Sequence, residues 1–231
     1  NFEKRMTGKK KIAILGLGLE GRWLFNYLRR DKNSALAVLD QKFGKNYLKN
    51  LGRFDVIYRS PGVPYNLPQI QKVKRKMSSL TKLFFERAKG KVVGITGSVG
   101  KTTTATLLHR ILKAAGKDVR LAGNIGKNPL ALLPKLSGKS VTIFELSSFQ
   151  LQDLDRSPGL AVVLDVYEEH LDKHKTLGEY LRAKENIARF QKRSDFIIYA
   201  GQNRRSKKIA SRSPGKKIAV FASDCEKYET L

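Results

Sequence analysis

A glycine-rich loop carries the strongest chemical signal in the 231-residue sequence. It runs from Gly97 to Thr103 as Gly-Ser-Val-Gly-Lys-Thr-Thr, after the apolar run 92–95 and before a helical pattern at 102–115. Backbone N–H groups of such a loop and the helix N-terminus attract phosphate, Lys101 can reach terminal phosphates, and the Thr102 hydroxyl can ligate Mg²⁺. Strict Walker A spacing needs glycine where this chain has Ile95. We therefore interpret residues 97–103 (Gly97, Ser98, Val99, Gly100, Lys101, Thr102 and Thr103) as a variant P-loop for a nucleoside triphosphate, rather than as a glycine turn with an incidental lysine.

Polar side chains follow two later apolar runs. Glu145 comes directly after 141–144, and His170 lies in the acidic stretch 165–172 that follows 161–164. Parallel sheets place ligands at the carboxyl ends of their strands, and Mg²⁺ prefers carboxylate oxygen. Glu145 alone would be a solvated strand-end carboxylate, but the nearby P-loop favours a magnesium ligand, and His170 is placed to bind a metal or a phosphate. His109, within a helix, and His174, in a loop, are interpreted as surface or packing residues.

The N-terminal part holds a second glycine motif. The sequence GLGLEG, residues 16–21, follows the apolar run 11–15 and precedes a helical pattern at 22–30. This is the phosphate-binding turn of a dinucleotide fold, and Asp40, at the end of the next apolar run, stands near the place of a ribose-binding carboxylate. Taken alone, the motif predicts NAD. The P-loop in the second half of the chain makes a redox role less favoured.

These motifs need parallel strands to position them. Further strands are expected at 35–39, 54–58, 196–199 and 218–221, and their alternation with helices predicts right-handed crossovers and parallel sheets. The predicted fold class is α/β, with a Rossmann-like domain at 1–89 followed by a P-loop-type domain at 90–231, divided within the polar stretch 87–91. We expect the basic, serine-rich stretch 202–217 to be a loop.

Composition narrows the class of protein. The chain is 41% hydrophobic and 29% charged, which fits a globular protein, and no window is apolar enough to span a membrane. The first 11 residues lack the apolar core of a secretory signal, and the single cysteine, Cys225, excludes an internal disulfide, so a cytoplasmic location is expected. The net charge of +26 is spread along the sequence, which favours a solvated surface over a nucleic-acid stripe.

Seven motifs in order resemble the Mur ligases of peptidoglycan synthesis. They are GLGLEG, SPGV, GITGSVGKTTT, GNIG, ELSSFQL, DVYEEHLD and YLRAKENI. The resemblance implies that the first domain binds the UDP part of a substrate, not NAD, through Gly18, Leu19, Glu20, Ser60, Pro61 and Gly62. It implies that residues 97–103 wrap the phosphates of ATP. It also implies that Asn124 and Ser147 contact the substrate near its reacting carboxyl.

The resemblance also implies a catalytic set of Lys101, Glu145, His170 and Lys184. Thr102 and Glu145 would ligate one Mg²⁺ and His170 a second, while Lys184, by composition one more surface lysine, matches a lysine that is carbamylated in the family and then ligates metal. The chain departs from the family at Val99 and Asp165, where asparagine is usual.

Within the family, the motifs are most similar to those of the enzymes that join D-glutamate to UDP-N-acetylmuramoyl-L-alanine through an acyl phosphate. The implied partners are these two substrates, with neither specific nucleic acid nor membrane insertion, and a monomer is expected. Family members carry a third domain, so we expect residues 1–231 to be an N-terminal fragment that is inactive alone. The alternatives are another Mur-type amino-acid ligase, a folylpolyglutamate synthase, a nucleic-acid-associated NTPase or a degenerate nucleotide-binding protein.

Overall fold

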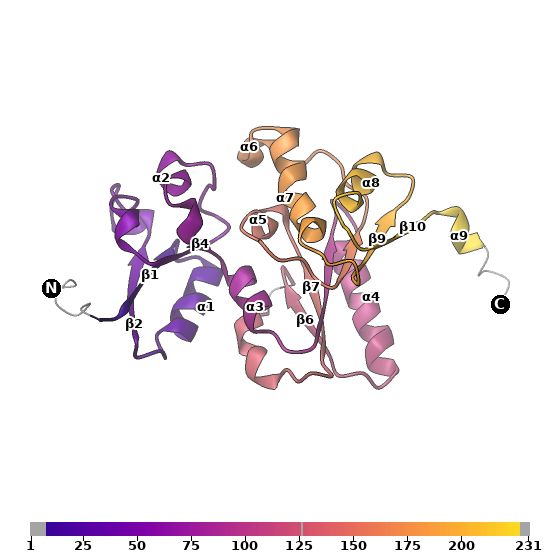
Figure 1. The fold of residues 1–231 in the computed structure, drawn as a ribbon, viewed down its shortest axis with the longest axis horizontal. Helices are drawn as coiled ribbons and strands as arrows, with labels where there is room; N and C mark the ends of the chain where they lie inside the picture. Colours follow the sequence, from indigo (N-terminus) through magenta and orange to yellow (C-terminus); the bar gives the residue numbers. More distant parts are fainter. Residues whose placement is uncertain (1–7, 126, 227–231) are drawn as a thin grey trace. The chain divides into compact units, whose positions relative to one another are not determined.

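The computed structural model describes residues 8–125 and 127–226, so Gly126 of the GNIG motif and most of the first 11 residues lie outside it, as does the side chain of Cys225. The chain forms two compact units, Asn1–Glu86 with Asn128–Ala131, and Arg87–Lys127 with Leu132–Leu231 (Figure 1). The short segment 128–131, which the sequence analysis assigns to the second domain, belongs to the first unit, where its 3-10 turn Pro129–Ala131 contacts the first helix. Of the described residues, no helix is both long and apolar enough to cross a membrane.

The first unit is built on a four-stranded parallel sheet with the order β2-β1-β3-β4. Strand β1 pairs with β2 on one side and with β3 on the other. Its apolar residues, such as Ala13 and Leu15, are fully buried with Ile57 in one core. The elements are β1 (Lys10–Leu15), α1 (Leu19–Leu28), β2 (Ser34–Leu39), β3 (Val56–Arg59), α2 (Pro68–Gln71), β4 (Met77–Ser78) and α3 (Leu80–Arg87), with 3-10 turns at Gln41–Phe43, Leu51–Arg53 and Lys74–Lys76.

The second unit is built on a six-stranded parallel sheet with the order β10-β9-β8-β5-β7-β6. The elements are β5 (Lys91–Thr96), α4 (Lys101–Ala114), β6 (Val119–Gly123), β7 (Val141–Glu145), α5 (Ser148–Leu151), β8 (Leu160–Val163), α6 (Leu171–His174), α7 (Leu177–Arg189), β9 (Phe196–Ala200), α8 (Arg204–Ala210), β10 (Lys216–Val220) and α9 (Ser223–Glu226), with a 3-10 turn at Leu133–Lys135.

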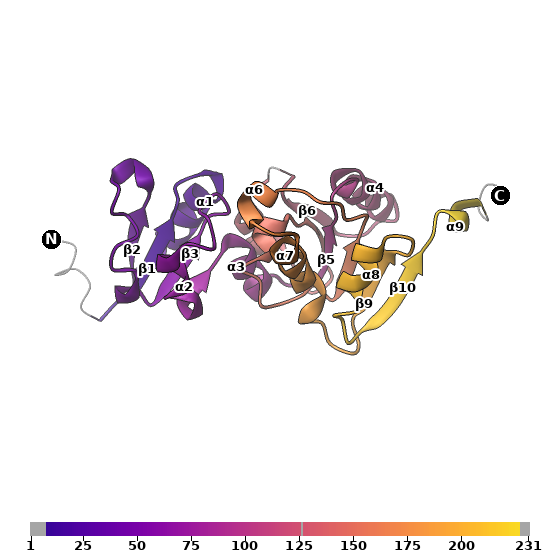
Figure 2. The ribbon, with the colours of Figure 1, turned by 90° about the horizontal axis from the view of Figure 1, so that it is seen from above.

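Helices cover both faces of the second sheet. Helix α4 packs on β5, β6 and β7, whereas α7 packs on β5 and α8 on β8 and β9. Figure 2 shows α4 on one side of the sheet and α7 and α8 on the other. Right-handed crossovers require this arrangement, because the chain leaves β5 in one direction along the sheet and leaves β8 in the opposite direction. The α/β class with parallel sheets, predicted from the sequence, is thereby confirmed.

One predicted loop contains regular structure. Residues 202–217, expected to be a loop, include helix α8 and the start of β10. The Asn203 side chain accepts a hydrogen bond from the Ser206 backbone at 2.9 Å and caps the helix, while Ile209 and Ala210 are buried. Basic residues on the outer face of α8 conceal this short apolar side in the sequence.

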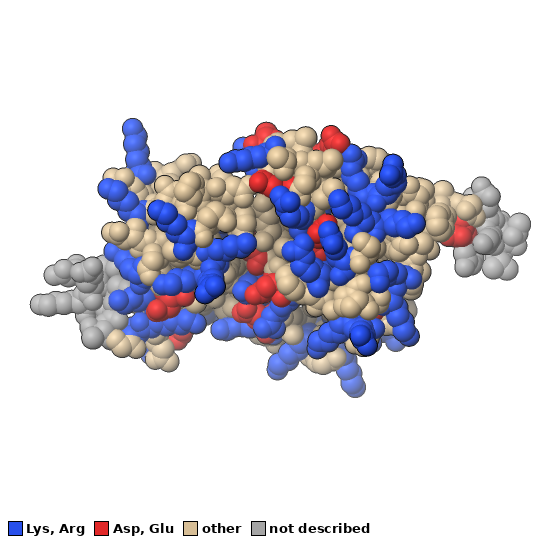
Figure 3. Space-filling model, turned by 45° about the horizontal axis from the view of Figure 1, so that its top comes forward, with Lys and Arg blue, Asp and Glu red and all other residues tan. Residues whose placement is uncertain are grey.

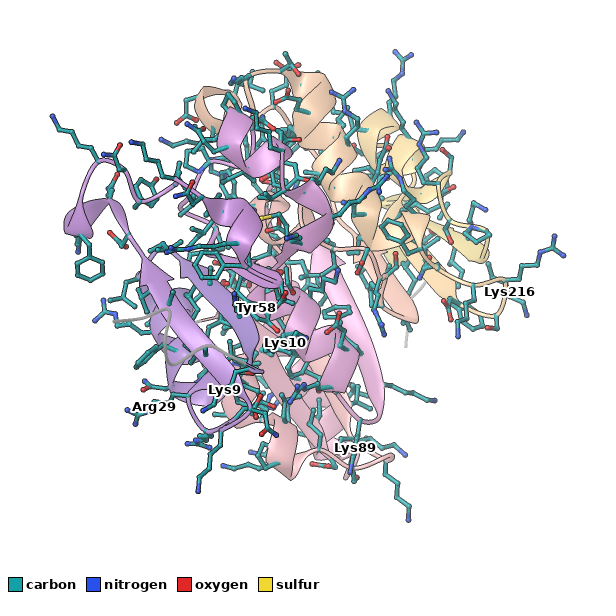
Figure 4. All side chains as sticks on the ribbon, turned by 60° about the vertical axis from the view of Figure 1, so that its left-hand side comes forward. Lys9, Lys10, Arg29, Tyr58, Lys89 and Lys216 are labelled. Carbon is teal, nitrogen blue, oxygen red and sulfur yellow. The ribbon has the colours of Figure 1, made fainter. Side chains whose placement is uncertain are left out.

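Basic side chains are distributed over the molecule. Figure 3 shows lysine and arginine scattered over the face in view, with acidic residues among them. Lys9, Lys10 and Arg29 lie where β1 begins and α1 ends, and Lys216 starts the edge strand β10 (Figure 4). Lys9, Lys10 and Lys216 therefore lie at or next to strand N-termini, opposite the edge at which strands of a parallel sheet present a ligand site.

Candidate active site

The P-loop joins the end of β5 to the start of α4. Gly100 is the N-cap of α4 and has φ = 78°, a left-handed conformation that favours glycine. The Ser98 backbone N–H donates to the Asp165 carbonyl at 2.7 Å, and the Ser98 hydroxyl accepts from the Tyr167 N–H at 2.8 Å. The loop is thus held from its far side by the segment that follows β8, and Val99 stands 57% exposed at its tip.

Lys101 is folded over the loop that precedes it. Its ammonium donates to the Gly97 carbonyl at 2.9 Å and to the Ser98 carbonyl at 2.6 Å. The positive charge therefore lies at the start of α4, where backbone N–H groups and the helix dipole also favour an anion. This arrangement can hold a polyphosphate.

Glu145 meets the first residues of α4 at the carboxyl end of β7. One of its carboxylate oxygens accepts a hydrogen bond from the Thr102 hydroxyl at 2.8 Å, and the other accepts from the Asn124 amide at 3.3 Å. Glu145 is only 2% exposed, so its carboxylate is held within the edge of the sheet. Two oxygen donors in direct contact beside a phosphate loop fit a hard cation such as Mg²⁺.

Lys184 is the most unusual ionisable group of the second unit. It lies on α7, is 2% exposed, and donates to the Gly97 carbonyl at 2.9 Å and to the Thr96 hydroxyl at 3.3 Å. Burial, with the nearby charge of Lys101, lowers the pKa of Lys184 to about 7, although Glu169 acts in the opposite direction. The expectation of a surface lysine, drawn from composition, is wrong, because helix packing turns this side chain onto the P-loop. A buried amine with this pKa is partly neutral at neutral pH and can react as a nucleophile.

His170 is placed differently from the other predicted ligands. It stands in a left-handed conformation just before α6, its side chain is exposed, and its ring contacts that of Phe149 at 5.2 Å between centroids. In the parts of the chain that the structure describes, no three His, Cys, Asp or Glu side chains form a cluster that could hold a metal. A cation at Glu145 would therefore depend on mixed donors, including the Thr102 hydroxyl.

Ser147 is positioned by a capping box at the start of α5. Its hydroxyl accepts from the Gln150 N–H at 3.2 Å, and its own N–H donates to the Gln150 side-chain carbonyl at 3.1 Å. The hydroxyl also donates to the Gln150 side-chain carbonyl at 3.3 Å, so the capping box fixes both the backbone and the side chain of this half-buried serine, two residues after Glu145.

Two residues of this region were not predicted to take part in a site, although His174 was interpreted as a surface or packing residue. His174, expected in a loop, ends α6 and is fully buried. Tyr180, on α7, has its hydroxyl 3.1 Å from the Ser98 hydroxyl and donates to Glu169 at 3.3 Å, and burial raises the pKa of Tyr180 to about 12. The motif YLRAKENI begins with Tyr180, but nothing in the sequence distinguishes a core tyrosine from one that supports a phosphate loop.

The glycine motif of the first unit forms a tight turn. A Cβ on Gly21 would lie 2.0 Å from the Gly16 carbonyl oxygen, so only glycine lets α1 approach the turn this closely. The Ser60 hydroxyl donates to the same carbonyl at 2.8 Å, which joins the SPGV turn to the glycine turn. Gly18 and Leu19 are exposed beside this junction, as is Gly62, while Glu20 and Pro61 are half-buried.

The buried side chains of Asp40 and Arg59 form hydrogen bonds to the glycine turn and the SPGV turn, respectively. The Asp40 carboxylate accepts backbone N–H groups of Leu17 at 2.6 Å and Lys42 at 2.9 Å, which lower the pKa of Asp40. This carboxylate is therefore engaged by the turn itself, which accounts for its position without a ribose. Arg59, 1% exposed, donates to carbonyls of Ser60 and Val63.

Comparison with known proteins places this architecture in a family. Residues 95–230 match the model of the Mur ligase middle domain. The chain is 35% identical over 237 residues to UDP-N-acetylmuramoylalanine--D-glutamate ligase of Acetivibrio thermocellus, covering 93% of this chain and 51% of that protein. It is 36% identical over 212 residues to the protein of the same name in Symbiobacterium thermophilum, covering 82% and 47%. The chain thus spans about half the length of the curated relatives it matches.

Solved structures show the same fold. The UDP-N-acetylmuramate:L-alanyl-gamma-D-glutamyl-meso-diaminopimelate ligase from Neisseria meningitides has a TM-score of 0.52 at 17% identity, covering 90% of this chain and 78% of that one. MurF from Acinetobacter baumannii also has a TM-score of 0.52, at 16% identity, covering 96% and 54%.

Proposed function

This chain belongs to the Mur ligase family, and we propose that it carries the nucleotide site of an ATP-dependent ligase that joins D-glutamate to UDP-N-acetylmuramoyl-L-alanine. The observation that supports the proposal is the geometry of loop 97–103, in which Lys101 folds over the loop at the start of α4, next to the hydrogen-bonded Thr102–Glu145 pair. The amino-acid specificity rests on the relatives of about one-third identity, which share the name UDP-N-acetylmuramoylalanine--D-glutamate ligase.

The chemistry of such a ligase begins with two anions. The substrate carboxylate attacks the γ-phosphorus of ATP, the bond to ADP breaks, and an acyl phosphate forms. Lys101 and the N–H groups of the P-loop would offset the negative charge that gathers on the transferring phosphoryl group. The amine of D-glutamate then attacks the acyl carbon, loses a proton, and expels inorganic phosphate, which leaves an amide.

The residues that would hold magnesium are Thr102 and Glu145, with His170 as the proposed ligand of a second ion. Mg²⁺ bound there would neutralise phosphate charge and help to align the two reacting oxygens. Asn124 holds the Glu145 carboxylate from its other side and would present its amide toward the substrate carboxyl, together with the Ser147 hydroxyl.

We further propose that Lys184 is carbamylated. Burial and Lys101 lower the pKa of Lys184 to about 7, so a neutral amine that can attack carbon dioxide is available at neutral pH. The resulting carbamate would be a carboxylate-like metal ligand in place of an ammonium. After incubation with ¹³C-bicarbonate, NMR is expected to show one carbamate resonance. The Lys184→Arg variant should lack this resonance, whereas the control Lys113→Arg, on the exposed end of α4, should retain it. A carbamate resonance that survives Lys184→Arg would contradict this assignment.

The first unit would bind the UDP part of the substrate at its two turns. Gly18, Leu19 and Glu20 on one side and Ser60, Pro61 and Gly62 on the other lie at the carboxyl ends of β1 and β3, where parallel sheets bind nucleotides. The polar backbone of both turns suits a diphosphate. We expect the ligase to act as a monomer in the cytoplasm, without specific binding of nucleic acid.

A substrate-dependence assay tests the proposed function. The protein encoded by the complete reading frame is expected to release phosphate from ATP only when UDP-N-acetylmuramoyl-L-alanine and D-glutamate are both present. Lys101→Ala should reduce this turnover at least about a hundredfold, whereas Lys113→Ala should leave it within twofold. Phosphate release triggered instead by another amino acid or by a folate would establish one of the alternative ligase activities.

A further inference from the structure

His174 occupies a fully buried position between three helices of the second unit. It is the last residue of α6, and it contacts α5; each of these helices is four residues long. Helices this short are not stable by themselves in water, so tertiary contacts must determine where they lie. The contacts of His174 therefore bear directly on the position of α5.

The imidazole contacts α5 at both ends. Its Nε2 lies 2.9 Å from the hydroxyl of Ser148, the first residue of α5, and its Nδ1 lies 3.2 Å from the side-chain amide nitrogen of Gln152, the C-cap. Between these two contacts the ring stacks on Phe149, with 4.9 Å between centroids and 10° between planes. One side chain thus spans the whole helix.

Each imidazole nitrogen of His174 meets a polar side chain of the α5 segment. Nδ1 faces the Gln152 side-chain amide and Nε2 faces the Ser148 hydroxyl, and the tautomer determines which of the two nitrogens donates. Both ring nitrogens are satisfied in a site closed to water. A side chain that served only to fill space would not need two directional bonds at this position.

The same ring reaches the phosphate loop through Tyr180. The two rings meet edge to face at 5.4 Å, the Tyr180 hydroxyl contacts the Ser98 hydroxyl, and the Lys184 ammonium lies 4.9 Å from the Tyr180 ring centroid. The Phe149 ring, stacked on His174, also touches His170. His174 is therefore packed against Phe149 and Tyr180, two side chains that contact residues of the candidate active site.

We propose that His174 is a positioning residue that fixes α5, and with it the Ser147 cap, against α6 and α7 for recognition of the substrate carboxyl. This inference rests on the proposed function, because it assigns Ser147 to the muramoyl substrate. His174 itself does not touch the reacting atoms. Its loss should weaken use of that substrate more than use of ATP, since the P-loop has its own bonds to Asp165 and Tyr167.

Steady-state kinetics of the complete ligase test the proposal. His174→Phe keeps the ring stacking and removes both hydrogen bonds. It is expected to lower kcat/KM for UDP-N-acetylmuramoyl-L-alanine about tenfold, with KM for ATP changed less than threefold. His174→Gln, which retains an acceptor and a donor, should recover part of the loss. His109→Phe, a matched replacement of a half-buried histidine on α4, should have no such effect.

A double-mutant cycle separates positioning from general destabilisation. Ser148→Ala removes the partner of Nε2, so the two substitutions should remove the same interaction. The loss of kcat/KM in the double variant should therefore be no more than about twice the loss in the more impaired single variant. Fully additive losses, or a His174→Phe enzyme with unchanged kcat/KM, would overturn the proposal. If instead Lys101→Ala retained full turnover, the proposed function would fail independently of His174.

Discussion

At the residue scale, the second unit gathers two amino groups around one carbonyl. Lys101 and Lys184 both donate to the Gly97 carbonyl, although they come from different helices. Two ammonium groups bound to one carbonyl repel each other, and burial of Lys184 adds to the free-energy cost of keeping both protonated. The site favours a neutral or modified Lys184. The free energy of unfolding should therefore depend on pH near neutrality, where an exposed lysine would not titrate.

The pH dependence has a definite sign. The pKa of Lys184 is about 7 in the folded protein and 10.5 when unperturbed, so between these values the unfolded chain binds more protons. The contribution of Lys184 to the free energy of unfolding is therefore least favourable below pH 7 and improves as pH rises toward 10.5. In buffers free of carbon dioxide, the wild-type chain should gain roughly 1–3 kcal/mol between pH 7 and 9 relative to Lys184→Met.

Chemical denaturation at both pH values measures this difference. Lys113→Met, an exposed position on α4, serves as the control and should track the wild type at each pH. A wild-type chain that gained no stability relative to Lys184→Met would show that the Lys184 amine titrates as an ordinary lysine.

Burial of single residues is what the sequence predicts least well. Lys184 looks like any other lysine in a chain with 46 lysines and arginines, and only its match to the family motif singles it out. His174 offers no such match, because its burial arises when α5, α6 and α7 pack together. The position of Glu145 at the edge of the sheet is predictable from its place after an apolar run, whereas its burial is not.

At the element scale, the turns after β1 and β5 rely on glycine for different reasons. Gly100 needs a positive φ, whereas Gly21 needs space, because its Cβ would overlap the Gly16 carbonyl oxygen. Gly21→Ala should therefore displace α1, destabilise the first unit by about 2–4 kcal/mol, and weaken binding of UDP-linked substrate. Gly52→Ala is the matched control, because no atom lies within 4 Å of the added Cβ and its φ is not positive.

Thermal unfolding and titration with UDP-N-acetylmuramoyl-L-alanine check this prediction. Equal unfolding temperatures for Gly21→Ala and Gly52→Ala would mean that α1 can move away from the turn at no cost. Retained stability with lost binding would place the glycine in ligand contact instead of helix packing.

Strands were easier to predict than short helices. The apolar runs at 92–95 and 141–144 form the neighbouring inner strands β5 and β7 of the second sheet, since buried parallel strands are apolar on both faces. Strand β6 was missed because Arg120 and Gly123 interrupt its apolar pattern. Helices α5 and α6 have a single turn each, too short for a helical period to appear in the sequence.

At the scale of the whole molecule, the net charge of +26 is spread along the sequence. Cations are scattered among acidic side chains on the face shown in Figure 3. We expect duplex DNA to bind weakly, with an affinity that falls at least about tenfold between 50 and 200 mM salt and shows no sequence preference. Fluorescence anisotropy measures this, and tight binding that survives 200 mM salt would favour a nucleic-acid role instead.

We expect the γ-phosphoryl group of ATP to pass to a substrate carboxylate before the amide forms. In that sequence one carboxylate oxygen becomes the bridge of the acyl phosphate and leaves with phosphorus when the amine attacks. The complete ligase, supplied with D-glutamate, ATP and UDP-N-acetylmuramoyl-L-alanine labelled with ¹⁸O in its carboxylate, should release phosphate that carries one ¹⁸O atom, as mass spectrometry would detect. Phosphate without the label, formed at the same rate as amide, would contradict an acyl-phosphate intermediate.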